Sequence, residues 1–180
     1  MASNPFETGA RKVIPAVLVY TFRSGSKGPE ILMLHRNAGP RSGGEVDYHS
    51  GKWNGLGGKF EADESPLETA RRELREESGL DLPEAAFQPL GVLTFPNFKA
   101  HKNEDWHCTV WVADVPESLR DFPVKGPEGD LHWVESDRVA ALPLWAGDRY
   151  FIAHVVSRQP FFGTIWYRGQ DVVRHWIQRI

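Results

Sequence analysis

The chain has 180 residues, of which 41% are hydrophobic and 25% charged, and its formal net charge is −3. A length of this order fits one domain with a substantial core, and a charge so near neutrality argues against a protein that coats duplex nucleic acid. The single cysteine, Cys108, excludes an internal disulfide and fits a reducing compartment. No apolar run approaches the roughly 20 residues of a membrane span and no secretory signal opens the chain, so we expect a soluble cytoplasmic protein without a membrane partner.

Residues 1–12 predict a polar N-terminal tail, and residues 13–180 predict a single domain. β-branched and apolar runs at 13–22 and 30–36 predict two strands joined by a turn. Residues 37–52 are rich in glycine and polar residues and predict a long loop, and loops of this length usually have a function of their own.

The next element is a helix with clear boundaries. Ser65-Pro66-Leu67-Glu68 forms a capping box with proline at the first helical position, and Gly79 stands where a helix C-cap is expected. The sequence therefore predicts a helix over residues 66–78, with Leu67, Ala70 and Leu74 on its buried side.

The rest of the chain predicts more strands than helices. The expected strands are 87–95, 106–115 and a short one at 131–136, and the expected helices lie near 137–142 and from about Asp148 to Ser157. The last segment predicts a hairpin around Gly169. Strands interrupted by a few helices indicate a mixed α+β sandwich and not a regular βαβ alternation.

Glu73, Glu76 and Glu77 cover an arc of about 100° on the predicted helix, beside its buried stripe. One interpretation is a solvated charged face, with neighbouring arginines as partners. The other is a metal site, because hard divalent cations bind several carboxylate oxygens and Mg²⁺ suits sites that it shares with substrate phosphates. The helix alone does not decide between these two interpretations.

The spacing around the helix decides in favour of the metal site. Nine residues fit the pattern G-x5-E-x7-R-E-U-x-E-E-x-G-U at every fixed position, where U is a bulky aliphatic residue: Gly58, Glu64, Arg72, Glu73, Leu74, Glu76, Glu77, Gly79 and Leu80. This pattern is the Nudix box, and the chain resembles a Nudix hydrolase. The resemblance implies the α+β Nudix fold, an α/β/α sandwich with a mixed sheet and a loop–helix–loop. It also implies hydrolysis of a nucleoside diphosphate linked to another group, with Mg²⁺ or Mn²⁺ as cofactor.

The resemblance carries roles over to the matching positions of this chain. Glu73 and Glu77 become metal ligands, and Glu76 becomes a further ligand or the group that activates water. Arg72 becomes the residue that holds the glutamates, and the carbonyl of Gly58 completes the metal shell. The family differs in which glutamate acts as base, so that role stays open.

One more carboxylate is expected outside the box. Glu104, just before the strand at 106–115, matches the place where many relatives supply a further ligand. An exposed loop acid is an equally good interpretation of the same residue.

Segments 51–59, 142–151 and 163–171 resemble the MutT-like oxidised-purine nucleoside triphosphatases within this family. The resemblance implies that Asn54, Trp145 and Asp148 bind the purine, since an amide and a carboxylate can bind a base edge and an indole can stack on its face. The alternatives are that Asn54 stabilises a turn and that Asp148 caps the following helix. Lys59 is counted with the substrate-binding residues.

Two features depart from that group. Relatives carry two neighbouring acids after the tryptophan, and here Gly147 replaces the first. The loop at 37–52 is longer, and it places Tyr48 where an aromatic ring could cover the base.

The sequence thus predicts a Mg²⁺-dependent enzyme that converts a nucleoside triphosphate to monophosphate and pyrophosphate, with 8-oxo-dGTP as the leading candidate. The alternatives are hydrolysis of nucleoside diphosphate sugars, dinucleotide polyphosphates or RNA 5′ ends. An inactive nucleotide-sensing module is a third possibility, and the intact glutamates argue against it. We expect a nucleotide as partner and no stable nucleic-acid partner, and no pattern in the sequence predicts an oligomeric state.

Overall fold

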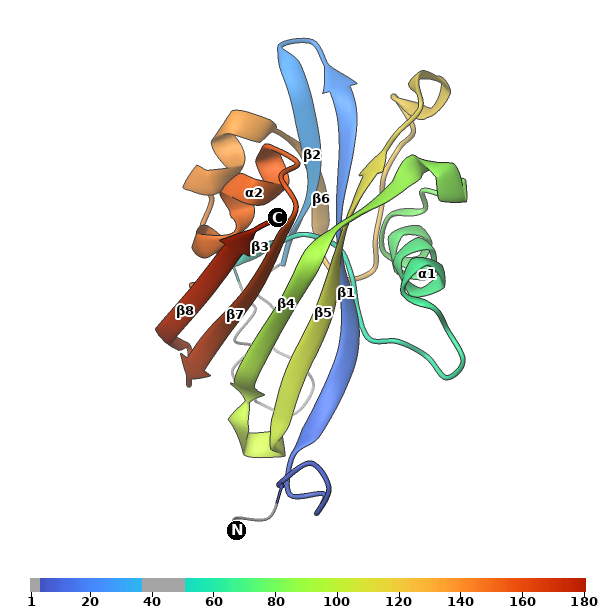
Figure 1. The fold of residues 1–180 in the computed structure, drawn as a ribbon. Coiled ribbons are helices and arrows are strands. Elements are labelled where there is room, and N and C mark those ends of the chain that lie inside the picture. The colour runs from blue at the N-terminus through green and yellow to red at the C-terminus, as the bar shows by residue number, and fades with distance from the viewer. Residues whose placement is uncertain (1–3, 37–50) are drawn as a thin grey trace.

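The computed structural model describes residues 4–36 and 51–180. Within these residues, eight strands form one mixed sheet in the order β3-β2-β1-β5-β4-β7-β8, and β6 also pairs with β2 (Figure 1). The strands are β1 (Lys12–Gly25), β2 (Gly28–His35), β3 (Trp53–Asn54), β4 (Phe87–Lys99), β5 (Glu104–Asp114), β6 (Asp130–Glu135), β7 (Phe161–Arg168) and β8 (Asp171–Arg179).

The centre of the sheet joins strands that are far apart in the chain. β1 pairs with β5 in parallel from Lys12↔Glu104 to Phe22↔Asp114, and β4 pairs with β7 in parallel. The other strand pairs are antiparallel. The mixed sheet that the sequence predicted is therefore confirmed.

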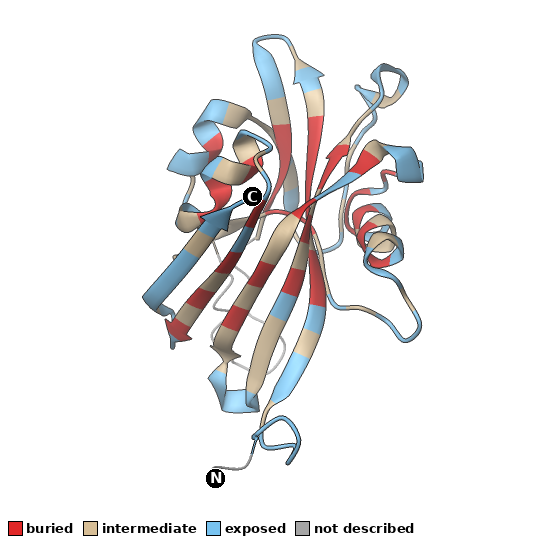
Figure 2. Ribbon diagram, in the orientation of Figure 1, coloured by how far each residue is buried: buried red, intermediate tan, exposed pale blue. Residues whose placement is uncertain are grey.

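Two hydrophobic clusters lie on opposite faces of the sheet. Helix α1 (Pro66–Ser78) covers one face, where Ala70 and Leu74 are fully buried. The short helix α2 (Ile152–Val156) and the neighbouring 3-10 turns cover the other (Figure 1). Figure 2 shows that the buried residues run along the middle of the strands and along the side of α1 that faces the sheet. This is the α/β/α layering expected from the sequence.

The predicted boundaries of α1 are confirmed by its caps. The Ser65 hydroxyl accepts a hydrogen bond from the Glu68 N–H at 3.3 Å, and the Glu68 carboxylate accepts one from the Ser65 N–H at 2.8 Å. Gly79 ends the helix in the left-handed conformation, with φ of 77°. Local chemistry therefore fixes where this helix begins and ends.

The segment after Trp145 differs from the prediction of one helix from Asp148 to Ser157. It forms a 3-10 turn over Asp148–Tyr150, and α2 begins only at Ile152, because Phe151 has a φ of −123° that an α-helix does not allow. Asp148 caps neither piece with its side chain. The interpretation of Asp148 as a helix cap was therefore wrong.

The short strand β3 was not predicted. Trp53 and Asn54 pair with β2, and Trp53 also forms a parallel bridge with Leu144. The Trp53 N–H donates to the carbonyl of Pro143 at 3.3 Å. This bridge ties β3 to the segment that carries Trp145 and Asp148.

Residues 4–11, in the predicted tail, form hydrogen-bonded turns beside the sheet. Arg11 forms an ion pair with Asp105 and donates a hydrogen bond to Asn97 at 2.7 Å. No helix among the described residues is long and apolar enough to cross a membrane.

Candidate active site

A cavity of about 560 Å³ lies beside α1 and the middle of the sheet. Many of the residues that line it belong to two groups that differ in chemistry. The first, which we call the acidic part, consists of Arg36, Gly58, Arg72, Glu73, Glu77 and Glu128. The second, the aromatic part, consists of Asn54, Phe98, Trp145, Asp148 and Tyr167.

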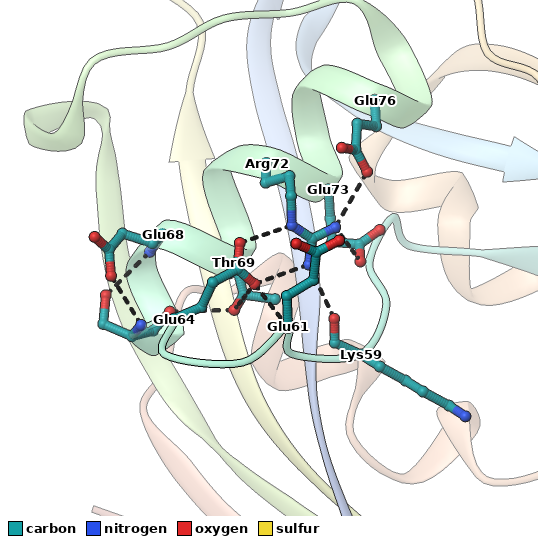
Figure 3. Close-up of polar contacts among 9 residues, drawn as sticks. Lys59, Glu61, Glu64, Glu68, Thr69, Arg72, Glu73 and Glu76 are labelled. Atoms are coloured by element: carbon teal, nitrogen blue, oxygen red, sulfur yellow. Dashed lines mark hydrogen bonds and ion pairs between the residues drawn. The ribbon is translucent and has the colours of Figure 1, made fainter.

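Arg72 is the centre of the hydrogen bonds around the acidic part (Figure 3). Its Nε and Nη2 donate to the two oxygens of Glu64 at 2.7 and 2.9 Å. Its Nη1 donates to Glu73 at 2.9 Å and to Glu76 at 3.1 Å, and its Nη2 also donates to the Lys59 carbonyl at 2.9 Å. Hydrogen bonds from Arg72 lower the pKa of Glu64 to about 2, so this pair is fully charged at neutral pH. The arrangement supports the predicted role of Arg72 in holding the glutamates.

Glu77 is the most buried carboxylate of the acidic part, with 6% of its surface exposed. Its Oε2 accepts a hydrogen bond from the Gly57 N–H at 2.8 Å. Desolvation raises the pKa of Glu77 to about 8, although the Gly57 hydrogen bond opposes the rise, and the charges of Glu128 and Glu73 add to it. Desolvation also raises the pKa of Glu73, against the opposing effect of Arg72.

Glu76 does not share this environment. Its side chain is 54% exposed, bonds to Arg72, and is not among the residues that line the cavity. Figure 3 shows Glu76 on the next turn of the helix, apart from Glu73. The three glutamates that the sequence places on one face of the helix are therefore divided. Glu73 and Glu77 line the cavity, and Glu76 lies outside it.

Two glycines allow the backbone to approach these glutamates. A Cβ atom on Gly58 would lie 2.3 Å from Oε1 of Glu73, and Gly57 has a φ of 140°. The carbonyl of Gly58 accepts a hydrogen bond from the Val17 N–H at 2.9 Å. A carbonyl oxygen has two lone pairs, so one is still available to a ligand.

Glu128 is a carboxylate that the sequence reasoning missed. It lines the cavity, forms an ion pair with Arg36, and its charge acts on both Glu73 and Glu77. The predicted Glu104 does not line the cavity, and its Oε2 instead accepts a bond from the Trp106 indole at 3.4 Å. The sequence contains a partial signal, since "GPEGD" places Glu128 and Asp130 in a turn beside the strand predicted at 131–136.

The residues of the acidic part fit a divalent cation that substrate would help to bind. Among residues 4–36 and 51–180, no three Asp, Glu, His or Cys side chains are grouped as a complete cation site. The buried Glu77 and the partly buried Glu73 repel each other, and a positive ion between their carboxylates stabilises both. Mg²⁺ is suited to such an incomplete protein shell, because it commonly keeps water ligands and binds substrate phosphates.

The aromatic part is assembled from distant segments. The ring of Phe98 lies edge-on to Trp145 and Tyr167, with centroid distances of 6.0 and 5.5 Å. Asn54 enters from β3 and Asp148 from the 3-10 turn. The structure thus places the predicted residues Asn54, Trp145 and Asp148 on one cavity. Tyr48 lies outside the described residues.

Asp148 supplies the carboxyl group of the aromatic part. Desolvation raises the pKa of its carboxyl to about 7. Its charge helps to raise the pKa of the Cys108 thiol to about 12, after the larger effect of burial. Near neutral pH the Asp148 carboxyl is therefore present both as a hydrogen-bond donor and as an acceptor.

Two lysines also line the cavity. Lys59 and Lys99 place their ammonium groups 5.6 and 4.6 Å from the ring centroid of Trp106. With Arg36 they supply positive charge to a cavity that also holds buried acids. A polyanionic substrate would meet both signs of charge there.

Residues 12–155 match the protein family described as the NUDIX domain. The chain belongs to the Nudix family. It is 30% identical over 126 residues to an oxidized purine nucleoside triphosphate hydrolase of Danio rerio, an alignment that covers 70% of this chain and 76% of the relative. The mouse protein of the same name is 28% identical over the same shares of the two chains.

Solved structures agree on the fold. A MutT protein from Bacillus halodurans superposes with a TM-score of 0.71 at 24% identity, covering 91% of this chain and 97% of the other. The NUDIX domain of Shewanella oneidensis NrtR in complex with ADP ribose has a TM-score of 0.61 at 16% identity, covering 87% and 90%. The predicted family and fold are confirmed, and the chain is a Nudix pyrophosphohydrolase, an enzyme class that generally uses divalent cations.

Proposed function

We propose that this enzyme hydrolyses a purine nucleoside triphosphate, with an oxidised purine such as 8-oxo-dGTP as the leading candidate, to the monophosphate and pyrophosphate. The observation that carries the proposal is a single cavity that joins the carboxylates of Glu73 and Glu77 to an aromatic wall with one carboxyl group. Phosphates and base of one nucleotide need these two environments side by side. The names of the Danio rerio and mouse relatives support the choice of substrate.

In this proposal Glu73, Glu77 and the Gly58 carbonyl would hold Mg²⁺. The cation supplies charge that neutralises phosphate oxygens and acidifies water. Arg72 keeps Glu73 oriented through its hydrogen bond at 2.9 Å, and Glu64 fixes Arg72 in turn. The chain thereby provides a preorganised site. Positioning and electrostatic stabilisation by such a site account for most of the catalysis in phosphoryl transfer.

The attacking water must transfer a proton to a carboxylate. Glu128 is the leading candidate, because it lines the cavity, is less buried than Glu77 and has only one oxygen in an ion pair. Glu76, which the resemblance also suggests, has one free oxygen but does not line the cavity. Arg36 and Lys59 would bind phosphate oxygens at the cavity wall. Asn54 and Asp148 would hydrogen-bond the base edge, while Trp145 supplies a stacking surface.

A nucleotide panel with Mg²⁺ and product identification tests the proposal. We expect monophosphate and pyrophosphate, and a higher kcat/KM for at least one oxidised purine nucleotide than for its unoxidised parent. Release of a sugar phosphate or a second nucleotide would show that the enzyme acts on a different class of substrate from the one proposed. If no nucleotide is hydrolysed, the remaining hypothesis is that the protein is a nucleotide-sensing module.

A dinucleotide polyphosphate is the second candidate substrate. A second hollow of about 330 Å³ adjoins the first and shares Phe98, Trp145 and Tyr167 with it. His101 and Gln170 also line this hollow, so it offers polar groups and aromatic rings to a second base. Including a diadenosine polyphosphate in the panel decides between the two candidates.

A further inference from the structure

The segment 125–130 connects the end of helix α1 to the end of strand β2. At its beginning, the Lys125 N–H donates a hydrogen bond to the Ser78 carbonyl at 3.2 Å, where α1 ends. At its end, Asp130 pairs with His35, the last residue of β2. Glu128, which lines the cavity, lies between these two attachments.

Two glycines flank this glutamate, and each packs against main-chain atoms. A Cβ atom on Gly126 would lie 2.0 Å from the Glu77 carbonyl oxygen, and one on Gly129 would lie 2.4 Å from the His35 carbonyl oxygen. Neither glycine adopts the left-handed backbone conformation that favours glycine. The requirement for glycine is therefore one of space, because the main chain of a helix or a strand cannot move aside as the end of a side chain can.

The packing at Gly129 fixes the position of Glu128. The Glu128 carboxylate forms an ion pair with Arg36, the residue that follows β2, and the Cα atom of Arg36 lies 3.2 Å from the Cβ position of Gly129. The end of β2 thus holds this glutamate through both its main chain and a side chain. The contact at Gly126 differs, since it also bears on Glu77 of the proposed metal site.

We propose that Gly129 is a positioning residue, whose missing side chain lets the main chain close on β2 and keeps the Glu128 carboxylate in the cavity. The inference rests on the proposed function, in which Glu128 is the leading acceptor of the water's proton. As the water oxygen bonds to phosphorus and the bridging P–O bond breaks, that proton passes to a Glu128 oxygen. A misplacement of about 1 Å at a reacting group can cost about 10²-fold in rate, so a residue that touches no substrate still controls the reaction.

The first test is Gly129→Ala, measured by steady-state kinetics on the preferred nucleotide. The methyl group pushes the main chain away from β2, so we expect kcat to fall about 10- to 100-fold while KM changes by less than about threefold. Circular dichroism checks that the variant is folded. A wild-type kcat, or a rise in KM without a fall in kcat, would overturn the proposal.

A double-mutant cycle distinguishes positioning of Glu128 from a general loss of structure. Glu128→Gln removes the proton acceptor and keeps its shape. If Gly129 acts through Glu128, adding Gly129→Ala to Glu128→Gln should lower kcat by less than about twofold more. Two losses that multiply would show that Gly129 acts on another part of the site, and the proposal would be wrong.

The matched control is Gly9→Ala. A Cβ atom at Gly9 would have no neighbour within 4 Å, and the φ of 72° gives the variant a conformational cost without a clash. We expect kcat and KM to equal those of the wild-type enzyme. A fall in kcat as large as that of Gly129→Ala would show that any such loss of glycine lowers activity, which would contradict the proposal.

Glu128→Asp tests the same point without added volume, so it also decides the matter if Gly129→Ala does not fold. This change keeps the charge and withdraws the carboxylate by one methylene group. Because the main chain is fixed at Gly129, the segment cannot advance to compensate, and kcat should fall about tenfold or more. A kcat near the wild-type value would show that the segment moves freely and would overturn the proposal.

Stability measurements separate this inference from the proposed function. Chemical denaturation of Arg36→Gln, Glu128→Gln and the double variant gives the coupling between the two side chains. We expect a coupling of about two- to fivefold in the folding equilibrium constant when Gly129 is present, and none in Gly129→Ala. Absence of hydrolysis by the wild-type enzyme would remove the proposed function, while this coupling still decides whether Gly129 holds Glu128 beside Arg36. Equal coupling with and without Gly129→Ala would remove that role even if hydrolysis is seen.

Discussion

The acidic and aromatic parts of the cavity differ in how the chain builds them. Most of the acidic part comes from residues 57–77, one loop and one helix, and Arg72 connects Glu73 to the neighbouring Glu64 and Glu76 by hydrogen bonds. The aromatic part collects single residues from β3, β4, β7 and the segment 145–148, and its rings meet edge to face. Under the proposed function, the residues for the reaction are therefore mostly local in sequence, whereas those proposed to bind the base are distributed. Substitutions in the second part can change the preferred base without altering the first.

The largest effect is expected at the acidic part. Glu77→Gln should lower kcat by about 10²-fold or more on every nucleotide, because it removes a charge that would hold the cation. The same change should raise the free energy of unfolding at pH 8, since the amide avoids the desolvation that raises the Glu77 pKa. Steady-state kinetics and chemical denaturation measure the two effects.

The control for Glu77→Gln is Glu117→Gln, which alters an exposed ion pair with Arg120. We expect both activity and stability to stay near wild-type values in this variant. Wild-type turnover in Glu77→Gln would contradict the assignment of the metal site. It would also remove the proposed division of the cavity into a metal-binding part and a base-binding part.

Arg72→Lys should have the next largest effect. A lysine cannot make the two-pronged bond to Glu64 and still reach Glu73 and the Lys59 carbonyl, so the glutamates lose their orientation. We expect kcat to fall about tenfold or more on all bases, and the free energy of unfolding to fall by about 2 kcal/mol. Arg75→Lys, on the exposed side of α1, is the matched control and should change neither quantity.

Asn54→Ala and Asp148→Ala test the aromatic part. Each should raise KM for the preferred purine nucleotide about tenfold, while the rate on tripolyphosphate, which has no base, changes little. Comparing kcat/KM on the nucleotide with that on tripolyphosphate gives the result. Equal losses on every base would remove the base-binding assignment and indicate a structural role instead.

The smallest expected effect is a dependence on pH. The pKa of Asp148 is raised to about 7 in the fold, so the folded protein binds this proton more tightly than the unfolded chain. The stabilisation that accompanies the protonated form is present at low pH and is lost as the pH rises through about 7. Asp148→Asn should abolish this loss and should also remove any change in base preference between pH 6 and 8. Parallel pH profiles of the two proteins would show that another group titrates.

The sequence predicted helix α1 well because the determinants of this helix are local. The capping box at Ser65, the C-cap at Gly79 and the spacing of the glutamates all lie within one short segment, and the structure confirms the helix they predict. The strands at the centre of the sheet were also predicted, since residues buried on both faces form continuous apolar runs.

The remaining features depend on contacts between distant residues. Only the folded chain shows that the charge of Glu128 acts on Glu73 and Glu77 while Glu104 bonds to Trp106. Gly147 and Tyr167 are twenty positions apart, and their contact depends on how the 3-10 turn packs on β7. The periodicity of side chains along the sequence contains no information on such a contact.

The bridge between Trp53 and the segment 143–144 has a consequence for ligand size. Asn54 and Trp145 each follow a bridged residue directly, so their backbones are fastened to each other by the Trp53–Pro143 hydrogen bond and the Trp53–Leu144 pairing. The separation of these two backbones is thus fixed by main-chain contacts. Under the proposed function, a larger or smaller side chain at either position would therefore change the thickness of the ring that fits between them, because the backbones cannot move apart to compensate.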